Sequence, residues 1–253
     1  MVELLEQAKK VAELIRNSNY VVALTGPAIS SGDTADEDYQ AANRLWTMVS
    51  PDDFSISRFK SDPDSYYDLG APYFSLLYQA KPSEAHYALA NMEKKGLLAA
   101  IITQNIDGLH REAGSKKVYE IHGTIKTATC VHCGGQHNVE DVVEDITTCS
   151  FPLQCPSCGE PLKPDLYLEG DTSAPDYDKA MAEAGKADLM LIIGSRMQVA
   201  PDNRIPAVCK KLVVIHREET FFDEQAVVLI NDDPGKALKL IEDQLNEGRK
   251  VES

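Results

Sequence analysis

Two cysteine pairs with the same CxxC spacing constrain this chain more than any other feature. Cys130 and Cys133 form the first pair, and Cys155 and Cys158 form the second, about twenty residues later. Each pair can present two thiolates to one ion at ~2.3 Å, and two pairs close a tetrahedron. Glycines follow both pairs, where a tight turn is expected. The pattern predicts a small zinc-binding module.

Disulfide bonds and a redox dithiol are the two rival interpretations of these cysteines. Disulfides are disfavoured in a cytoplasmic chain, and redox CxxC motifs rarely occur as a spaced pair. Four thiolates leave no position for water, so the zinc is expected to be structural. We interpret His132 and His137 as surface residues, and Cys149 and Cys209 as reduced thiols.

Short apolar runs alternate with amphipathic helical patterns along the rest of the chain. The first helix is predicted to end near Asn17, and further helices to cover 83–96, to begin at 176 and to close the chain. The predicted strands are 20–24, 97–103, 189–193, 213–215 and 226–230. This alternation predicts an α/β fold with a doubly wound, Rossmann-like parallel sheet. Residues 27–80 are interpreted as a mobile loop followed by a helical insert, whose aromatic residues form core.

The charge balance bears on the kind of partner. The net charge is −15 and the pI is near 4.8, so nucleic acids and anionic membranes are repelled. A lysine-rich protein segment is easier to receive, although the acidity also has the simpler interpretation that it only keeps the protein soluble. No apolar run approaches the ~20 residues of a membrane span, and the N-terminus lacks a signal peptide. We therefore expect a cytoplasmic protein.

Polar side chains follow the buried strand that ends at Thr103. Gln104, Asn105 and Asp107 offer two amides and a carboxylate at the carboxyl end of a strand, where a polar ligand is expected. His122 comes shortly before the first cysteine pair. A lone histidine is usually structural, but one that borders a domain junction is a candidate for function.

Five segments together resemble the sirtuin family: TQNIDGLHREAGS (103–115), EIHG (120–123), the CxxC pairs, LKPD (162–165) and LIIGS (191–195). The resemblance covers nearly the whole chain. It implies a Rossmann-like NAD-binding domain from 1–30, 82–125 and 164–253, a cofactor loop and helical insert at 31–81, and a zinc-binding module at 126–163.

The resemblance also implies a reaction and its residues. NAD and an acyl-lysine protein or peptide meet at the domain junction, nicotinamide is released, and the acyl group is transferred to ADP-ribose. His122 is the implied general base, and Asn105 and Asp107 the other implied catalytic residues. The implied cofactor contacts are Gly26, Pro27, Ala28, Gln40, Gln104, Asn105, Asp107, Gly194, Ser195 and His216.

The chain departs from the family pattern around the ligands. Pro27 and Ala28 replace residues of a Gly-Ala-Gly turn, which removes one amide donor and adds a Cβ. Gln40 stands where the cofactor loop carries arginine. On the substrate side, Tyr167 and Glu169 replace apolar residues, while Arg196 and His216 differ on the adenosine side.

Three functions remain open from the sequence. The first is an NAD-dependent lysine deacylase with a modified acyl preference. The second is a sirtuin-like protein that has lost turnover and binds NAD, ADP-ribose or a protein partner. The third is a mono-ADP-ribosyltransferase. The oligomeric state is not predicted.

Overall fold

The computed structural model describes residues 2–30, 50, 52, 55–143, 150–168, 170–171, 176–198 and 201–247. These residues form a six-stranded parallel sheet in the order β3-β2-β1-β7-β8-β9. Its strands are β1 (Val21–Thr25), β2 (Ala100–Thr103), β3 (Val118–Glu120), β7 (Leu189–Ile193), β8 (Leu212–Ile215) and β9 (Ala226–Ile230). The order doubles back between β1 and β7, so the predicted doubly wound sheet is confirmed.

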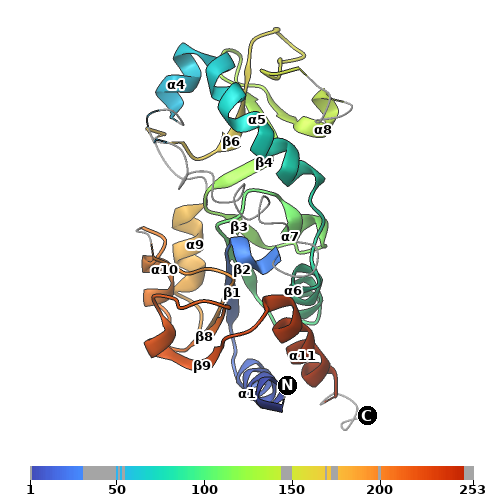
Figure 1. The fold of residues 1–253 in the computed structure, drawn as a ribbon, viewed down its shortest axis with the longest axis vertical. Helices are drawn as coiled ribbons and strands as arrows, with labels where there is room; N and C mark the ends of the chain where they lie inside the picture. Colours follow the sequence, from blue (N-terminus) through green and yellow to red (C-terminus); the bar gives the residue numbers. More distant parts are fainter. Residues whose placement is uncertain are drawn as a thin grey trace.

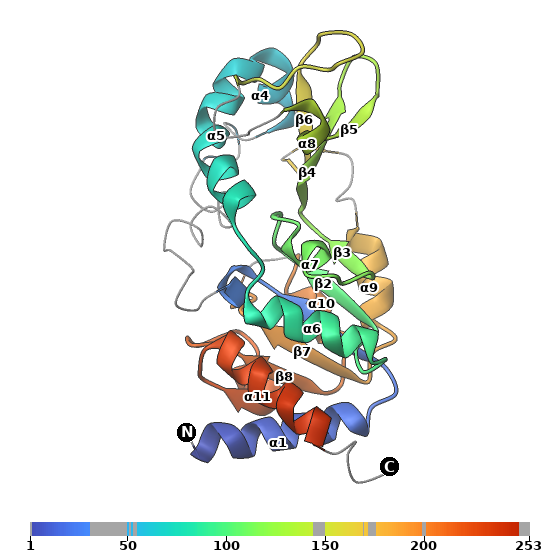
Figure 2. The same ribbon diagram turned by 90° about the vertical axis from the view of Figure 1, so that its right-hand side faces the viewer.

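Helices cover both faces of this sheet (Figure 2). One face packs against α1 (Val2–Arg16), α6 (Glu84–Lys94) and α11 (Pro234–Glu247), and the other against α9 (Tyr177–Ala184) and α10 (Arg204–Ala207). Strands β1 and β7 are buried along their whole length, because both faces are covered. The short elements that complete this domain are η1 (Pro27–Ser30), α7 (Leu109–Glu112) and η2 (Asp223–Gln225).

Local sequence explains where the helices begin. Ser83 caps α6, and the His86 side chain accepts a hydrogen bond from the Ser83 backbone N–H, so the two residues form a capping box. Asp62 caps α5 (Pro63–Gln79) by accepting a hydrogen bond from the backbone N–H of Ser65, and Pro63 occupies the first turn, where its missing N–H costs nothing.

A second, smaller unit lies above the carboxyl ends of the parallel strands (Figure 1). It contains an antiparallel sheet of β5 (Gln136–Asn138), β4 (Gly123–Cys130) and β6 (Leu162–Leu166), with α8 (Val139–Val142) beside it. Helices α4 (Ile56–Ser61) and α5 pack on this unit through a shared core. The predicted aromatic core of the helical insert is confirmed for Phe59, Tyr66, Tyr67 and Phe74; Trp46 and Phe54 lie outside the described residues.

The structure differs from the sequence predictions at one strand start and adds elements that were not predicted. The strand predicted at 97–103 begins only at Ala100, because Leu97 and Leu98 pack onto the core ahead of the regular pairing with β1. The short edge strand β3 and the antiparallel sheet were not predicted. In the described part of the chain, no helix is long and apolar enough to cross a membrane.

Candidate active site

The candidate residues gather along one edge of the parallel sheet. Each follows the carboxyl end of a strand, and these ends share an edge around the point between β1 and β7 where the strand order reverses. Gly26 follows β1; Gln104, Asn105 and Asp107 follow β2; His122 follows β3; Gly194 and Ser195 follow β7; and His216 follows β8. Gln40 lies outside the described residues.

Glycine packing holds the ends of β1 and β7 close together. A Cβ added to Gly26 would lie 2.6 Å from the Ser195 Cβ and 2.9 Å from Gln104 Oε1. The Ser195 hydroxyl donates to that same Oε1 atom at 2.6 Å. A hydrogen bond therefore joins the ends of β2 and β7 directly beside the end of β1, and only glycine at position 26 leaves room for it.

The backbone donors of the first strand–helix turn are used within the protein. The N–H of Gly26 donates to the Ile193 carbonyl, that of Ala28 to the Gly194 carbonyl at 2.9 Å, and that of Ile29 to the Gly26 carbonyl. Pro27 has no N–H. Residues 26–29 therefore direct no uncommitted N–H toward a phosphate. The loss of a backbone donor expected at Pro27 thus applies to the whole turn.

His122 is held at both ring nitrogens. Its Nδ1 lies 3.0 Å from the Gln104 carbonyl oxygen, which can only accept, so Nδ1 carries a proton. Its Nε2 lies 3.0 Å from Oδ2 of Asp202. Asp202 is 7% exposed and also accepts a hydrogen bond from Gln104 Nε2 at 2.5 Å. This carboxylate was not predicted, because a Pro-Asp pair in a loop carries no signal beyond a turn.

Asn105 and Asp107 are both buried in the segment after β2. Asp107 accepts a hydrogen bond from the backbone N–H of Leu109 at 2.8 Å, which starts α7. Asn105 is 1% exposed, yet neither atom of its side-chain amide has a hydrogen-bond partner among the described residues. Because leaving such groups unpaired costs about 1–3 kcal/mol each, a bound ligand or water is the expected partner.

A pair of buried histidines lies beneath this segment. The rings of His86 and His110 are 4.6 Å apart, and His110 Nε2 contacts the Thr25 hydroxyl at 2.8 Å. Burial lowers the pKa of His86 to about 4, although Asp107 acts in the opposite direction. Burial and the neighbouring His86 lower the pKa of His110 well below its ordinary value. Both are neutral near pH 7 and support the site rather than exchange protons.

Three of the residues that depart from the family pattern have defined places. The Tyr167 N–H donates to the His122 carbonyl at 2.9 Å, which ties β6 to the segment carrying the candidate base. Arg196 lies 3.2 Å from Glu218. His216 Nδ1 accepts from the Glu218 N–H, and burial lowers the pKa of this imidazole. Glu169 lies outside the described residues.

The four cysteines of the small unit form one cluster. Their sulfur atoms all lie within 4.8 Å of one another. The two pairs share one turn geometry: the N–H of Gly134 donates to the Cys130 carbonyl, and that of Gly159 to the Cys155 carbonyl. Four thiolates at this separation fit a closed tetrahedral shell, so these residues would hold a structural zinc ion. Cys209 is a buried thiol apart from the cluster.

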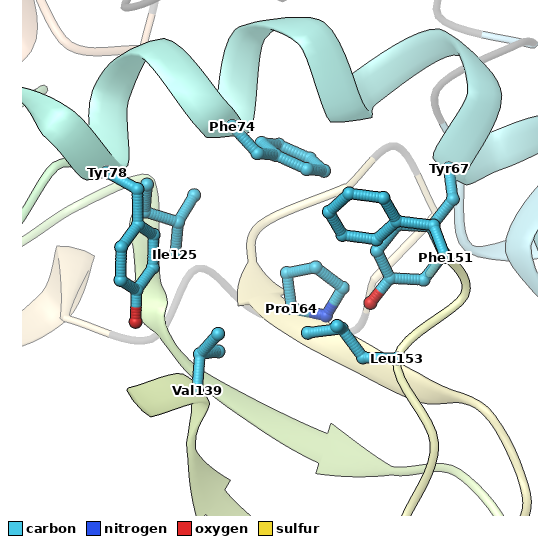
Figure 3. Close-up of a pocket in the computed structure, with 8 residues that line it drawn as sticks. All are labelled: Tyr67, Phe74, Tyr78, Ile125, Val139, Phe151, Leu153 and Pro164. Carbon is cyan, nitrogen blue, oxygen red and sulfur yellow. The ribbon is translucent and has the colours of Figure 1, made fainter. Parts of the chain in front are cut away.

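An apolar cavity lies inside the small unit, between α5 and the antiparallel sheet (Figure 3). Its lining residues are Tyr67, Phe74, Tyr78, Ile125, Val139, Phe151, Leu153 and Pro164. The Tyr67 hydroxyl donates a hydrogen bond to the Leu162 carbonyl, and the rings of Tyr67 and Phe151 stack. The cavity is a packing feature of the small unit, separate from the His122 site.

Comparison with known proteins identifies the family of this chain. The Sir2 family profile matches residues 38–201, more than half of the chain. NAD-dependent protein deacetylase 2 of Caldanaerobacter subterraneus subsp. tengcongensis is 38% identical over 234 residues, covering 92% of this chain and 94% of the relative. NAD-dependent protein deacetylase of Sulfolobus acidocaldarius is 39% identical over 233 residues, covering 90% and 91%.

Solved structures give the same result. One reported under "Structural Basis for the Mechanism and Regulation of Sir2 Enzymes" has a TM-score of 0.84 and 31% identity, covering 97% of this chain and 99% of that one. A Sir2 protein bound to a myristoylated histone peptide has a TM-score of 0.79 and 30% identity, covering 97% and 99%. From the site residues, the family profile and these relatives together, the chain belongs to the Sir2 family.

Proposed function

We propose that this chain is an NAD-dependent protein lysine deacylase, which transfers the acyl group to ADP-ribose and releases nicotinamide. The observation that carries the proposal is the buried amide of Asn105, which has no hydrogen-bond partner among the described residues and is next in sequence to the Gln104 carbonyl that holds His122. Such an amide needs a polar partner, and nicotinamide offers a matching amide. The family and its relatives named as deacetylases supply the reaction class.

The protein's own residues have distinct tasks in this proposal. NAD supplies the ADP-ribosyl group that becomes the acyl acceptor. His122 accepts a proton from a ribose hydroxyl through Nε2, because Nδ1 is committed to the Gln104 carbonyl. Asn105 and Asp107 bind the nicotinamide side, and Gln104 with Ser195 borders the ribose. The acyl-lysine peptide, of the kind bound by the histone-peptide relative, reaches His122 beside Tyr167.

A direct assay tests this function. Zinc-loaded protein is incubated with NAD and an acetyl-lysine peptide, and nicotinamide is measured by chromatography while the peptide is weighed by mass spectrometry. We expect one deacetylated peptide per nicotinamide, and no nicotinamide release with the unacetylated peptide. His122→Ala lowers the rate per folded molecule by about 10²–10⁴ with zinc content unchanged. A loss of Tm with full activity per folded molecule instead assigns His122 a structural role.

A second candidate function is binding without turnover. It is favoured by the turn at 26–29, whose backbone donors are all used within the protein. Calorimetric titration with NAD and with ADP-ribose separates the two: binding of either ligand, without release of nicotinamide from NAD in the presence of any acylated peptide, supports this alternative.

The third function, mono-ADP-ribosyl transfer, predicts a peptide that gains mass in the deacetylation assay, and a peptide that only loses its acyl group excludes it.

A further inference from the structure

The Asp202 carboxylate contacts Nε2, the ring nitrogen through which His122 would act as a base. It lies in the loop that leads from β7 to α10, and a single carboxylate oxygen, Oδ2, contacts both His122 Nε2 at 3.0 Å and Gln104 Nε2 at 2.5 Å. Gln104 in turn accepts a hydrogen bond from the Ser195 hydroxyl. A continuous chain from Ser195 through Gln104 and Asp202 to His122 therefore runs across the sheet edge.

The hydrogen-bond partners of His122 determine which of its ring nitrogens carry protons. The Gln104 carbonyl requires a proton on Nδ1 of His122, so a neutral ring would turn the lone pair of Nε2 toward a carboxylate oxygen. A proton must therefore lie between Nε2 and Oδ2. Burial alone raises the pKa of Asp202, but the hydrogen bond and charge of His122, with the hydrogen bond from Gln104, lower it overall. The Asp202 carboxylate is therefore the acceptor of this contact, and Nε2 of His122 is the donor.

We propose that Asp202 is a positioning residue that stores His122 as an imidazolium in the free protein, and that the ribose must displace this contact before His122 becomes a base. The inference rests on the proposed function, because it assigns the regulation of the same site. When the pair opens, the Nε2 proton passes to solvent, and the freed lone pair accepts the hydroxyl proton. Base activation is thereby coupled to occupation of the site.

Other charged groups near Asp202 come from the two helices packed on its loop. The Tyr177 hydroxyl on α9 donates to the Pro201 carbonyl at 2.8 Å. Arg204 starts α10. Burial and then Asp202 raise the pKa of Tyr177, while Arg204 lowers it. Tyr177 stays neutral near pH 7, and Arg204 does not ion-pair with Asp202 among the described residues, so His122 is its cationic partner there.

The first test is nuclear magnetic resonance of the imidazole nitrogens in the zinc-loaded protein without NAD. The chain has six histidines, and the His122 signals are those removed by His122→Gln. We expect protons on both ring nitrogens in the wild type at neutral pH. In Asp202→Asn, which keeps the size of the side chain, we expect a neutral ring protonated at Nδ1 alone; Asp202→Ala serves as a second variant if the first does not fold.

Asp188→Asn is the matched control. It removes a carboxylate that precedes β7 at the opposite end of the strand, where Asp188 accepts the N–H groups of Asn19 and Tyr20. We expect the His122 signals to be unchanged in this variant. A singly protonated His122 in the wild type, or a ring that stays doubly protonated in Asp202→Asn, overturns the proposal.

ADP-ribose and a pH–rate profile complete the test. Saturating ADP-ribose is expected to remove the Nε2 proton signal in the wild type, and a bound complex that keeps it overturns the displacement step. In turnover, Asp202→Asn is expected to move the acidic limb of nicotinamide release to lower pH by roughly one unit or more, which is about tenfold more activity on that limb. An unmoved limb contradicts the proposal. Failure of the wild type to release nicotinamide contradicts the proposed function alone, because the resonance and ADP-ribose measurements do not need turnover.

Discussion

Gly194 ends β7 in a conformation that leaves no room for a side chain. Its φ is +64°, in the left-handed region. An added Cβ would lie 2.2 Å from the Ile29 nitrogen and 2.6 Å from the Ala28 carbonyl carbon, both main-chain atoms of η1. Main-chain atoms cannot rotate away as a long side chain can, so Gly194→Ala forces η1 away from the end of β7.

The expected cost has two parts. Holding alanine in the left-handed region costs about 1–2 kcal/mol. Ordinary contact for a Cβ begins near 3.4 Å, so the main chain of η1 must shift by more than 1 Å or stay in contact under strain. Overpacking of this kind costs about 1–3 kcal/mol. We therefore expect Gly194→Ala to lower the free energy of unfolding by about 2–5 kcal/mol, and to weaken NAD binding because the η1 turn is displaced.

Urea denaturation followed by far-UV circular dichroism measures the stability, and Gly96→Ala is the matched control. Gly96 has a φ of +71°, close to that of Gly194, but a Cβ there meets nothing within 4 Å. It should therefore lose only the conformational part, about 1–2 kcal/mol. Equal losses in the two variants would refute the claim that close approach of η1, rather than backbone conformation, demands glycine at position 194.

Three further outcomes follow from the structure. Cys158→Ser should abolish bound zinc, measured by elemental analysis, and unfold the small unit, since ligand binding in such sites is worth on the order of 10 kcal/mol; full zinc content would contradict the assignment. The pKa of Glu183 is held at about 2, because hydrogen bonds from Lys186, Tyr20 and Lys117 outweigh burial. The ionised carboxylate therefore stabilises the fold above about pH 4.5, and the stability difference between wild type and Glu183→Gln should shrink as the pH falls from there toward 2. A difference that grows over this range would contradict the reasoning. Gln40→Arg should tighten NAD binding in a titration, because it restores a cation to an acidic loop; unchanged affinity would count against that interpretation.

The parallel sheet could be predicted because its strands are buried on both faces. Strands β1 and β7 appear in the sequence as apolar runs, and in the structure these runs form buried strands, as predicted. Strand β3 has three residues, of which only Val118 is buried, and it lies at the sheet edge. No apolar run or alternation exists in so short a strand, so its position is fixed by pairing with β2.

The small antiparallel sheet had a weaker signal for a different reason. The pairing of β4 with β6 shifts register between Thr124 and Ala128, so the alternation of buried and half-buried residues along β4 is interrupted. A pattern of period two is the main sequence signal of such a strand, and this irregularity removes it. The cysteine spacing predicted that a metal module exists there, but not the sheet that supports it.

The candidate site was also predictable only in the part that follows buried strands. Gln104, Asn105 and Ser195 follow buried strands, and the carboxyl ends of parallel strands share one edge, so their proximity followed from the predicted fold. Asp202 lies beyond its strand, in a loop. Its contact with His122 depends on how that loop returns across the sheet edge, which no local pattern encodes.

The turn at 26–29 and Asp202 act on different steps of the proposed reaction. The turn lacks uncommitted N–H groups, so its effect falls on the affinity for NAD and appears in KM. Asp202 holds the proton on Nε2 of His122 in the free protein, so its effect appears in the pH dependence of kcat/KM, which reports the groups of the free enzyme. A variant that restores a backbone donor at the turn should therefore lower KM without moving the pH profile, whereas Asp202→Asn should move the profile whatever it does to KM. If the two kinds of variant changed the same parameter, the turn and the carboxylate would belong to one binding function, and the storage of His122 as an imidazolium would have no separate role.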